Sequence, residues 1–313
     1  MADIAAAKSQ APEKKKNEVW IRLKRNKMAM VGMVIVILNI LIAVFAPVLT
    51  SYDPNEMDYG NAFAKPYIFS MFQSGEDADA DGAAIAAEEG KHWFGTDNFG
   101  RDLFARVIYG SRISLIVGLA SIVIGGSIGT VLGLIAAFYG GRIDNVIMRI
   151  MDGLFAFPFV LLSIALMTVL GTGMQNIIIV VSVVNIPGFT RIARGAALTV
   201  KELDFVDASR ALGAKNSRLI FNHIFPNCMA SLIVYATMSV AGAILSEAAL
   251  SFLGLGIKPP DPSWGGILKA GQEYLQVAPQ MCIFAGVAIL VTVLGFNLFG
   301  DGLRDALDPK QKD

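Results

Sequence analysis

The sequence predicts an all-α, polytopic membrane protein with about six transmembrane helices. Of its 313 residues, 54% are hydrophobic and only 17% are charged, whereas soluble domains carry about a quarter charged residues. The apolar residues gather in long blocks, and about 20 consecutive apolar residues suffice for a helix to cross a bilayer. Basic residues are concentrated in some of the intervening segments and acidic residues in another, which predicts a fixed orientation in the membrane.

Residues 1–27 form a basic tail that precedes the first predicted span. This tail carries eight Lys or Arg, and the apolar run 28–50 that follows has 23 residues without a charge. The run is long and lacks a convincing small-residue cleavage site. It therefore predicts a first transmembrane helix and not a cleaved secretory signal.

Residues 51–112 are predicted to form an external loop. Between residues 51 and 105 the chain has eleven Asp or Glu but only three Lys or Arg, and an acidic insertion occupies about 75–90. Such a composition is typical of a solvated segment. The segment Asp102–Tyr109 has its apolar side chains on one helical face, which predicts a short amphipathic helix. This helix either lies flat on the outer surface or packs against the protein at the interface.

Residues 113–300 hold the other five predicted spans. The second span, 113–138, is rich in glycine, which favours close helix packing in membranes. Pro158 and Pro187 are expected to break the third and fourth spans, because proline removes a backbone hydrogen bond. The remaining spans are predicted at 145–170, from about Asn176, at 229–253 and at 281–299, and residues 301–313 form a C-terminal tail.

Six crossings place both termini on the same side of the membrane. The N-terminal tail has eight Lys or Arg, residues 191–227 have six and the C-terminal tail has three. Because basic loops stay in the cytoplasm, both termini and the loop at about 196–227 are predicted to be cytoplasmic, with residues 51–112 outside.

A short helix is predicted within the cytoplasmic loop. Acidic residues cluster at its start, where they suit the positive end of the helix dipole, and Gly213 suits its end. Its apolar stripe is too small to form a core, which favours a docking surface for another protein. The alternative is a loop that packs only on its own spans. The candidate docking residues are Phe205, Val206, Asp207, Ala208, Ser209, Leu212 and Gly213, with Pro226 marking the start of the fifth span.

Polar residues inside the spans are further candidates, because a charge at the bilayer centre costs about 2.5–3.5 kcal/mol on insertion scales. Glu247 either lines a transport pathway or lies hydrogen-bonded between helices. Asn185 and Pro187 are also candidates for the pathway, and Asn185 is suited to linking two helices. Arg149 and Asp152 are three residues apart, which predicts an ion pair within one helix.

The cytoplasmic segment carries a spaced motif. Asp207-Ala208-Ser209 is followed by Gly213 after three residues and by Pro226 thirteen positions later. This arrangement resembles the "EAA" loop of bacterial ABC-importer permeases, whose consensus is Glu-Ala-Ala, three residues, Gly, nine residues and Ile-x-Leu-Pro. Here Asp207 replaces Glu, Ser209 replaces the second Ala, and His223 and Phe225 stand where Ile and Leu are usual.

Other segments narrow the resemblance. Phe94-Gly95-Thr96-Asp97, Leu250–Gly256 with Trp264, and Gly300–Pro309 are similar to segments of the peptide and nickel importers. The similar segments run from about residue 20 to the end. Together they resemble the C-type permease subunit of dipeptide or oligopeptide importers, which implies the type I ABC importer permease fold.

The resemblance implies that the chain forms half of a translocation pore in the bacterial cytoplasmic membrane. A homologous second permease subunit would complete the pore, and an external binding protein would deliver the peptide. Two cytoplasmic ATPases would grip the docking loops and carry ATP and Mg. The sequence contains no G-x-x-x-x-G-K-[ST] phosphate loop. No cofactor is therefore expected in this chain, and it is not expected to be an enzyme.

Two other functions remain open from the residues alone. A stand-alone secondary transporter could use Glu247 and broken helices for ion coupling, and a nickel chelate could replace the peptide. An intramembrane protease would need paired catalytic groups that the spans lack. The zero net charge gives no basic field for nucleic acid. Two cysteines, Cys228 and Cys282, and two histidines support neither a disulfide framework nor a zinc site.

Overall fold

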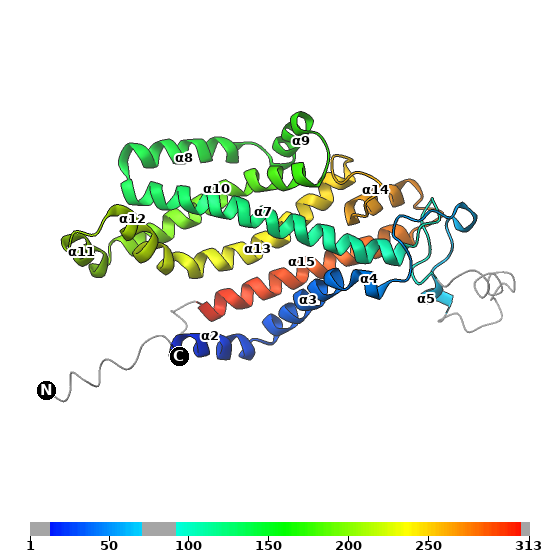
Figure 1. Ribbon diagram of the computed structural model, residues 1–313, viewed down its shortest axis with the longest axis horizontal. Coiled ribbons are helices and arrows are strands. Elements are labelled where there is room, and N and C mark those ends of the chain that lie inside the picture. Colours follow the sequence, from blue (N-terminus) through cyan, green and yellow to red (C-terminus); the bar gives the residue numbers. More distant parts are fainter. Residues whose placement is uncertain (1–12, 71–91, 308–313) are drawn as a thin grey trace.

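The computed structural model describes residues 13–70 and 92–307, and within them all regular secondary structure is helical apart from one isolated β-bridge between Thr96 and Asp102. The long helices lie side by side along the longest axis of the molecule (Figure 1). Within the described residues, five helices are long and apolar enough to cross a membrane, and a bent pair can supply a sixth span. The predicted all-α membrane fold is confirmed. The acidic insertion at about 75–90 lies outside the described residues.

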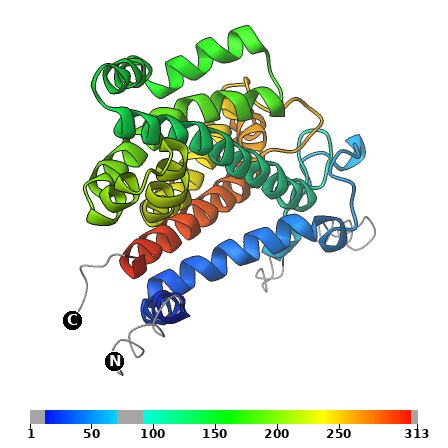
Figure 2. The same ribbon diagram turned by 60° about the vertical axis from the view of Figure 1, so that its left-hand side comes forward.

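The spans are carried by helices whose bounds are as follows: α3 (Lys27–Val44), α7 (Leu103–Tyr139), α8 (Gly141–Ala156) with α9 (Phe159–Leu170), α10 (Met174–Lys201), α13 (Phe225–Phe252) and α15 (Gln280–Leu307). Shorter helices join them: α2 (Glu13–Arg25), α4 (Ala46–Leu49), η2 (Tyr59–Asn61), α5 (Tyr67–Ser70), α11 (Asp204–Ala211), α12 (Asn216–Arg218), the π-helical η3 (Leu219–Ile224) and α14 (Trp264–Glu273). In both ribbon views α3 and the α8–α9 pair lie on opposite sides of the bundle (Figure 1 and Figure 2).

A glycine ladder brings α7 and α10 together. Cβ atoms added at Gly125 and Gly129 would lie 2.5 and 2.6 Å from the carbonyl oxygens of Ser182 and Ile186, and one at Gly133 would meet the oxygen of Thr190. The two helices therefore run parallel at a distance that only glycine permits. Helices in a bilayer associate through such close van der Waals packing, since lipid provides no hydrophobic drive between them.

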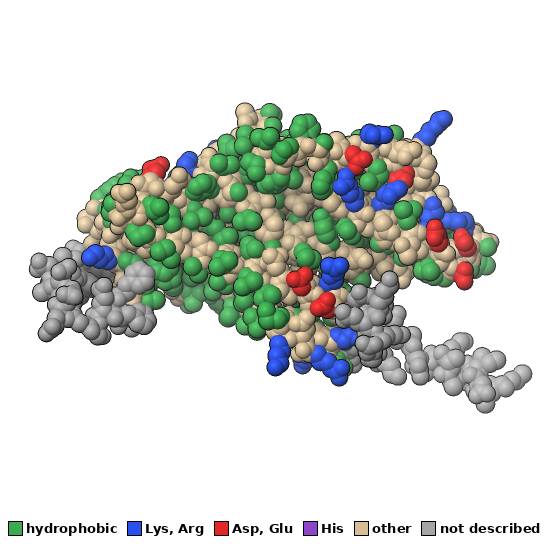
Figure 3. Space-filling model, turned by 180° about the vertical axis from the view of Figure 1, so that it is seen from behind, with side chains coloured by type: hydrophobic (Ala, Val, Ile, Leu, Met, Phe, Trp, Pro, Cys, Tyr) green, Lys and Arg blue, Asp and Glu red, His purple; other side chains and the backbone are tan. Residues whose placement is uncertain are grey.

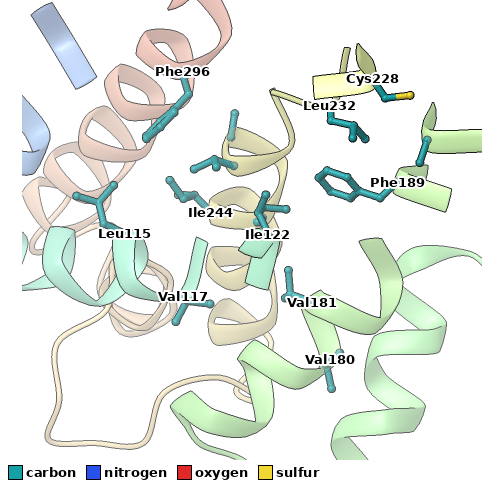
Figure 4. Close-up of a cluster of buried hydrophobic side chains, with 14 of the residues drawn as sticks. Leu115, Val117, Ile122, Val180, Val181, Phe189, Cys228, Leu232, Ile244 and Phe296 are labelled. Carbon is teal, nitrogen blue, oxygen red and sulfur yellow. The ribbon is translucent and has the colours of Figure 1, made fainter. Parts of the chain in front are cut away.

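The main core lies where α7, α10, α13 and α15 meet, as Figure 4 shows. The side chains of Ile122, Val181, Phe189 and Ile244 there are 4% exposed or less. Around this core the outward faces of the spans are apolar, and Figure 3 shows hydrophobic side chains covering the middle of one face. Most charged side chains on that face gather toward the end that carries α11 and α2. This distribution fits a bundle embedded in hydrocarbon.

Several predicted boundaries are wrong. Asp102 caps α7 and its carboxylate accepts a bond from the backbone N–H of Ala105, so the segment expected as a separate amphipathic helix is the first part of the second span. Gly110, which directly follows this segment, lies inside α7 and does not stop the helix. Pro187 lies within α10 without breaking it, whereas Pro158 does break the third span, between α8 and α9, with a bend of 94°.

The end of the bundle where α7 begins is fixed by buried polar contacts. Arg101 pairs with Asp97 at 2.7 Å, and Arg106 donates to the carbonyl of Pro54 at 2.7 Å. His92 Nδ1 lies 2.8 Å from Asp102 Oδ2. The ring of Tyr52 lies against His92, and burial together with the Asp102 carboxylate raises the pKa of Tyr52. These contacts attach the loop segments before and after the undescribed insertion to the start of α7.

Candidate docking site and polar residues of the spans

The candidate docking helix, α11, is the two-turn segment that follows α10. It begins at Asp204, after Leu203 in an extended conformation. Asp204 and Asp207 lie in its first turn, where carboxylates stabilise the positive end of the helix dipole by about 0.3–1 kcal/mol each. The predicted short helix and its acidic start are confirmed.

Gly213 ends α11 in the left-handed conformation, with φ +79°. Its backbone N–H donates to the carbonyl of Arg210, and the next N–H, of Ala214, donates to the carbonyl of Ser209. These bonds satisfy the last carbonyls of the helix. A Cβ at Gly213 would meet nothing within 4 Å, so glycine is needed for its backbone angle and not for space. The sequence predicted this helix end correctly.

Val206 anchors α11 to the rest of the bundle. Its side chain is fully buried in the main core, together with Leu219 and Ile220 of η3. The ring of Phe205 lies 6.5 Å from the ring of His223, centre to centre. Because η3 continues into α13, α11 is attached to the start of the fifth span. Val206 was predicted to belong to the docking surface and is instead its buried support.

The surface that α11 presents is apolar at several points. The side chain of Leu212 is 88% exposed and that of Phe205 41% exposed. Asp207 and Arg210 form an exposed pair at 3.0 Å. Sequence reasoning missed two neighbours of this surface, Leu203 at 46% and Phe221 at 50% exposed. The available signal was that both are apolar residues in the segment between two spans.

Pro226 lies in the first turn of α13 (Phe225–Phe252), which confirms the prediction that it marks the start of the fifth helix. Helix continues from Asn216 to Phe252, and the proline lies near the start of its α-helical part. The preceding residues, Leu219–Ile224, form a π-helical segment. Proline cannot donate a backbone bond and its ring clashes with the carbonyl four residues earlier, and a widened turn is one way for a helix to accommodate this.

Glu247 lies between α7 and α13 and is fully buried. Its two carboxylate oxygens accept hydrogen bonds from Ser114, at 2.9 Å, and from Ser251, at 2.8 Å. Of the two alternatives for this residue, the structure places it between helices, and its carboxylate faces no open pathway in the described chain.

Asn185 does not link two helices. Its side-chain amide donates to the carbonyl of Val181 in the same helix, at 2.8 Å. Pro187, two residues later, is buried. Since both side chains are turned toward their own helix or the core, the structure gives no contact that supports their predicted place on a pathway.

The prediction of an ion pair between Arg149 and Asp152 is wrong. Asp152 instead pairs with Arg191 of α10, at 2.7 Å. A second pair, Asp144 with Arg194 at 2.6 Å, also connects α8 to α10. Spacing along one helix identifies only neighbours on that helix, whereas these partners are 39 and 50 residues apart in the sequence.

Comparison with known proteins decides the family. The model of the binding-protein-dependent transport system inner membrane component matches residues 129–313, which include α11 and the motif around it. The chain belongs to this family. A second model, the N-terminal transmembrane domain of oligopeptide transport permease C, matches residues 17–66. The permease assignment excludes a stand-alone secondary transporter, and the chain is a multi-pass component of the inner membrane.

Relatives match the permease over nearly its whole length. A dipeptide transport system permease protein of Alkalihalophilus pseudofirmus is 45% identical over 295 residues, 94% of this chain and 90% of that protein. A glutathione transport system permease protein of Shigella flexneri is 44% identical over 297 residues, 95% of this chain and 91% of that protein.

The fold is also found in a solved structure. The methionine ABC transporter MetNI, in an inward-facing conformation, contains a chain that matches with a TM-score of 0.55 and 18% identity. The match covers 65% of this permease and 96% of that chain. The predicted type I ABC importer permease fold is confirmed.

Proposed function

We propose that this permease imports dipeptides or other short peptides as one half of the pore of an ATP-driven importer. The support is the pair of relatives above, one named for dipeptide and one for glutathione transport, each matched over at least 90% of its length. Glutathione is itself a short peptide. These names favour a peptide over the nickel chelate that the motifs had left open.

Energy reaches the pore through α11. The observation that carries this step is an exposed apolar surface, Phe205 and Leu212, on a helix whose Val206 is fixed in the core. A partner protein bound to α11 would move the start of α13 together with α11. ATP and Mg would be bound by two cytoplasmic ATPase subunits, and this chain would hold no cofactor and catalyse no reaction.

The proposed assembly has four further proteins. A homologous second permease subunit completes the pore, two ATPases dock at the two α11 surfaces, and an extracytoplasmic binding protein delivers the peptide to the end that carries α14. Both termini lie in the cytoplasm. In support, α2, the end of α15 and α11 lie toward the same end of the molecule (Figure 1), and α2 is basic in its last turn.

Reconstitution of the complete importer in vesicles tests the proposal. We expect ATP-dependent uptake of a labelled dipeptide in the presence of the binding protein, with ATP hydrolysis stimulated by the loaded binding protein. Glutathione and a nickel chelate supplied in the same way serve as comparison substrates. Uptake of the nickel chelate without uptake of either peptide would contradict the peptide assignment, and uptake without ATP would contradict the importer.

A further inference from the structure

The basic helix α2 ends where the first span begins. α3 has 18 residues and is therefore about 27 Å long at 1.5 Å per residue, which does not exceed the roughly 30 Å of a hydrocarbon core. Because α3 needs its whole length to cross, Lys27 at its start lies at one membrane surface. A single residue, Asn26, separates α3 from Arg25 at the end of α2. α2 therefore adjoins the lipid headgroups.

One side of α2 is held against the end of α15. Leu23 is buried there in a small cluster with Ala29 and Ala306. The side-chain oxygen of Asn26 accepts a bond from the backbone N–H of Ala29, and its amide donates to Asp305 at 3.2 Å. These contacts fix which side of α2 faces the protein and which side faces outward.

The outward side of α2 is both apolar and basic. The side chain of Trp20 is 45% exposed and that of Ile21 is 51% exposed. Lys24, Arg25 and Lys27 are exposed as well, and none of them pairs with a carboxylate in the part of the chain that the structure describes. The ammonium of Lys24 lies 5.0 Å from the centre of the Trp20 ring. An exposed tryptophan beside basic residues is typical of a helix at a membrane interface.

The charge of this segment indicates what covers its outward side. Residues 13–27 carry seven Lys or Arg and only two Glu. Figure 3 shows Lys and Arg side chains together on the projecting part of the molecule that α2 forms. Groups of four to eight basic residues directly beside a span bind anionic lipid headgroups. An anionic lipid surface therefore matches both the charge and the exposed apolar side chains.

We propose that α2 is a binding site for the headgroups of anionic phospholipids. Lys24, Arg25 and Lys27 bind the lipid phosphates, and Trp20 and Ile21 enter the boundary between headgroups and acyl chains. Bound lipid holds α2 at the surface, and the end of α15 with it, because the two helices are packed together. The inference depends neither on the transported substrate nor on the side of the membrane that α2 occupies.

Quenching of tryptophan fluorescence by brominated lipids tests the site in the full-length chain. The permease is incorporated into vesicles of phosphatidylcholine and phosphatidylglycerol in equal amounts, with one of the two lipids brominated. The chain has three tryptophans, so the contribution of Trp20 is the difference between the wild type and Trp20→Phe. We expect brominated phosphatidylglycerol to quench this contribution more strongly than brominated phosphatidylcholine. Added salt should reduce the preference, because it screens exposed charges.

Single charge removals and two matched controls locate the preference. Lys24→Gln and Arg25→Gln should each lower it about five-fold, since each removes one basic residue from the surface. Lys258→Gln changes an exposed lysine between α13 and α14, at the other end of the bundle, and should leave it unchanged. Trp93 is 47% exposed and lies before α7 at that end. The difference between the wild type and Trp93→Phe should show no preference for either lipid.

Three results would overturn the inference. Equal quenching of Trp20 by both lipids would exclude headgroup recognition, and no quenching by either would show that Trp20 does not contact lipid. An unchanged preference in the triple variant Lys24→Gln, Arg25→Gln, Lys27→Gln would show that these basic residues do not bind the headgroup. None of these measurements requires transport, so each of these results would leave the proposed peptide import intact.

Discussion

The left-handed glycine at the end of α11 is the residue on which a rigid docking helix depends. Gly213→Asp places a side chain on a residue with φ +79°, a left-handed conformation that favours glycine. It also adds a negative charge at the negative end of the helix dipole, which costs about 0.3–1 kcal/mol. The same charge would have to be desolvated on docking. We expect the variant to insert normally and to lose ATPase stimulation by loaded binding protein, measured in vesicles.

Gly213→Asn is the matched control for this variant. Asparagine has nearly the shape of aspartate and tolerates the left-handed conformation, but it adds no charge. It should therefore retain most of the stimulation. Equal, full stimulation in both variants, or normal peptide uptake by Gly213→Asp, would contradict the docking assignment.

The buried carboxylate of Glu247 predicts a loss of stability on truncation. Glu247→Ala leaves the hydroxyls of Ser114 and Ser251 without their acceptor and opens a cavity, which together cost about 2–5 kcal/mol. The midpoint of thermal unfolding in detergent should fall accordingly. Glu247→Gln keeps the shape of the side chain and one acceptor oxygen, so its unfolding midpoint should fall less. Loss of uptake in Glu247→Gln without a lower midpoint would instead place the carboxylate on the transport path.

At the scale of helices, the glycine ladder of α7 predicts where the bundle cannot tolerate a larger side chain. In Gly129→Leu the new Cβ would lie 2.6 Å from the carbonyl of Ile186 and 2.7 Å from Cβ of Phe189, so α7 and α10 must move apart. Overpacking of this kind costs about 1–3 kcal/mol, and we expect a lower unfolding midpoint. Gly242→Ala in α13, where a Cβ meets nothing within 4 Å, should be neutral or stabilising. An equal change in the unfolding midpoint of Gly129→Leu and Gly242→Ala would contradict this close packing of α7 against α10.

Helix identity could be predicted from the sequence far better than helix ends. Charge-free apolar runs identify spans because hydrocarbon excludes charge, and Pro158 marked the sharp bend correctly. The start of the second helix was misplaced because Gly110, directly after Tyr109, does not stop the helix but lies inside α7 against Trp264. The start of the fifth helix at Pro226 was predicted correctly. Helices extend past the membrane boundary, where hydropathy gives no signal.

Across the whole molecule, contacts between distant segments set the limit of prediction. The short helix α11 and its end could be predicted because their signals are local, and Gly213 acts through its own backbone angle. The Asp152–Arg191 pair was not predictable, since its partners meet only after α8 folds back beside α10. The same holds for Val206, whose burial depends on η3. Sequence patterns identify which residues are polar at membrane depth, and the packing decides which of them face each other.

The orientation of the whole chain gives the last prediction. Cys228 and Cys282 are first replaced by Ala, and one cysteine is introduced at an exposed position, as Asp58→Cys or Leu212→Cys. These positions lie at opposite ends of the bundle, beyond α4 and in the α11 loop. The basic tails and the α11 loop should lie in the cytoplasm. A membrane-impermeant maleimide should therefore label Asp58→Cys in intact cells and Leu212→Cys only after permeabilisation. Labelling of Leu212→Cys from outside intact cells would place α11 beyond the reach of any cytoplasmic ATPase and refute the coupling mechanism.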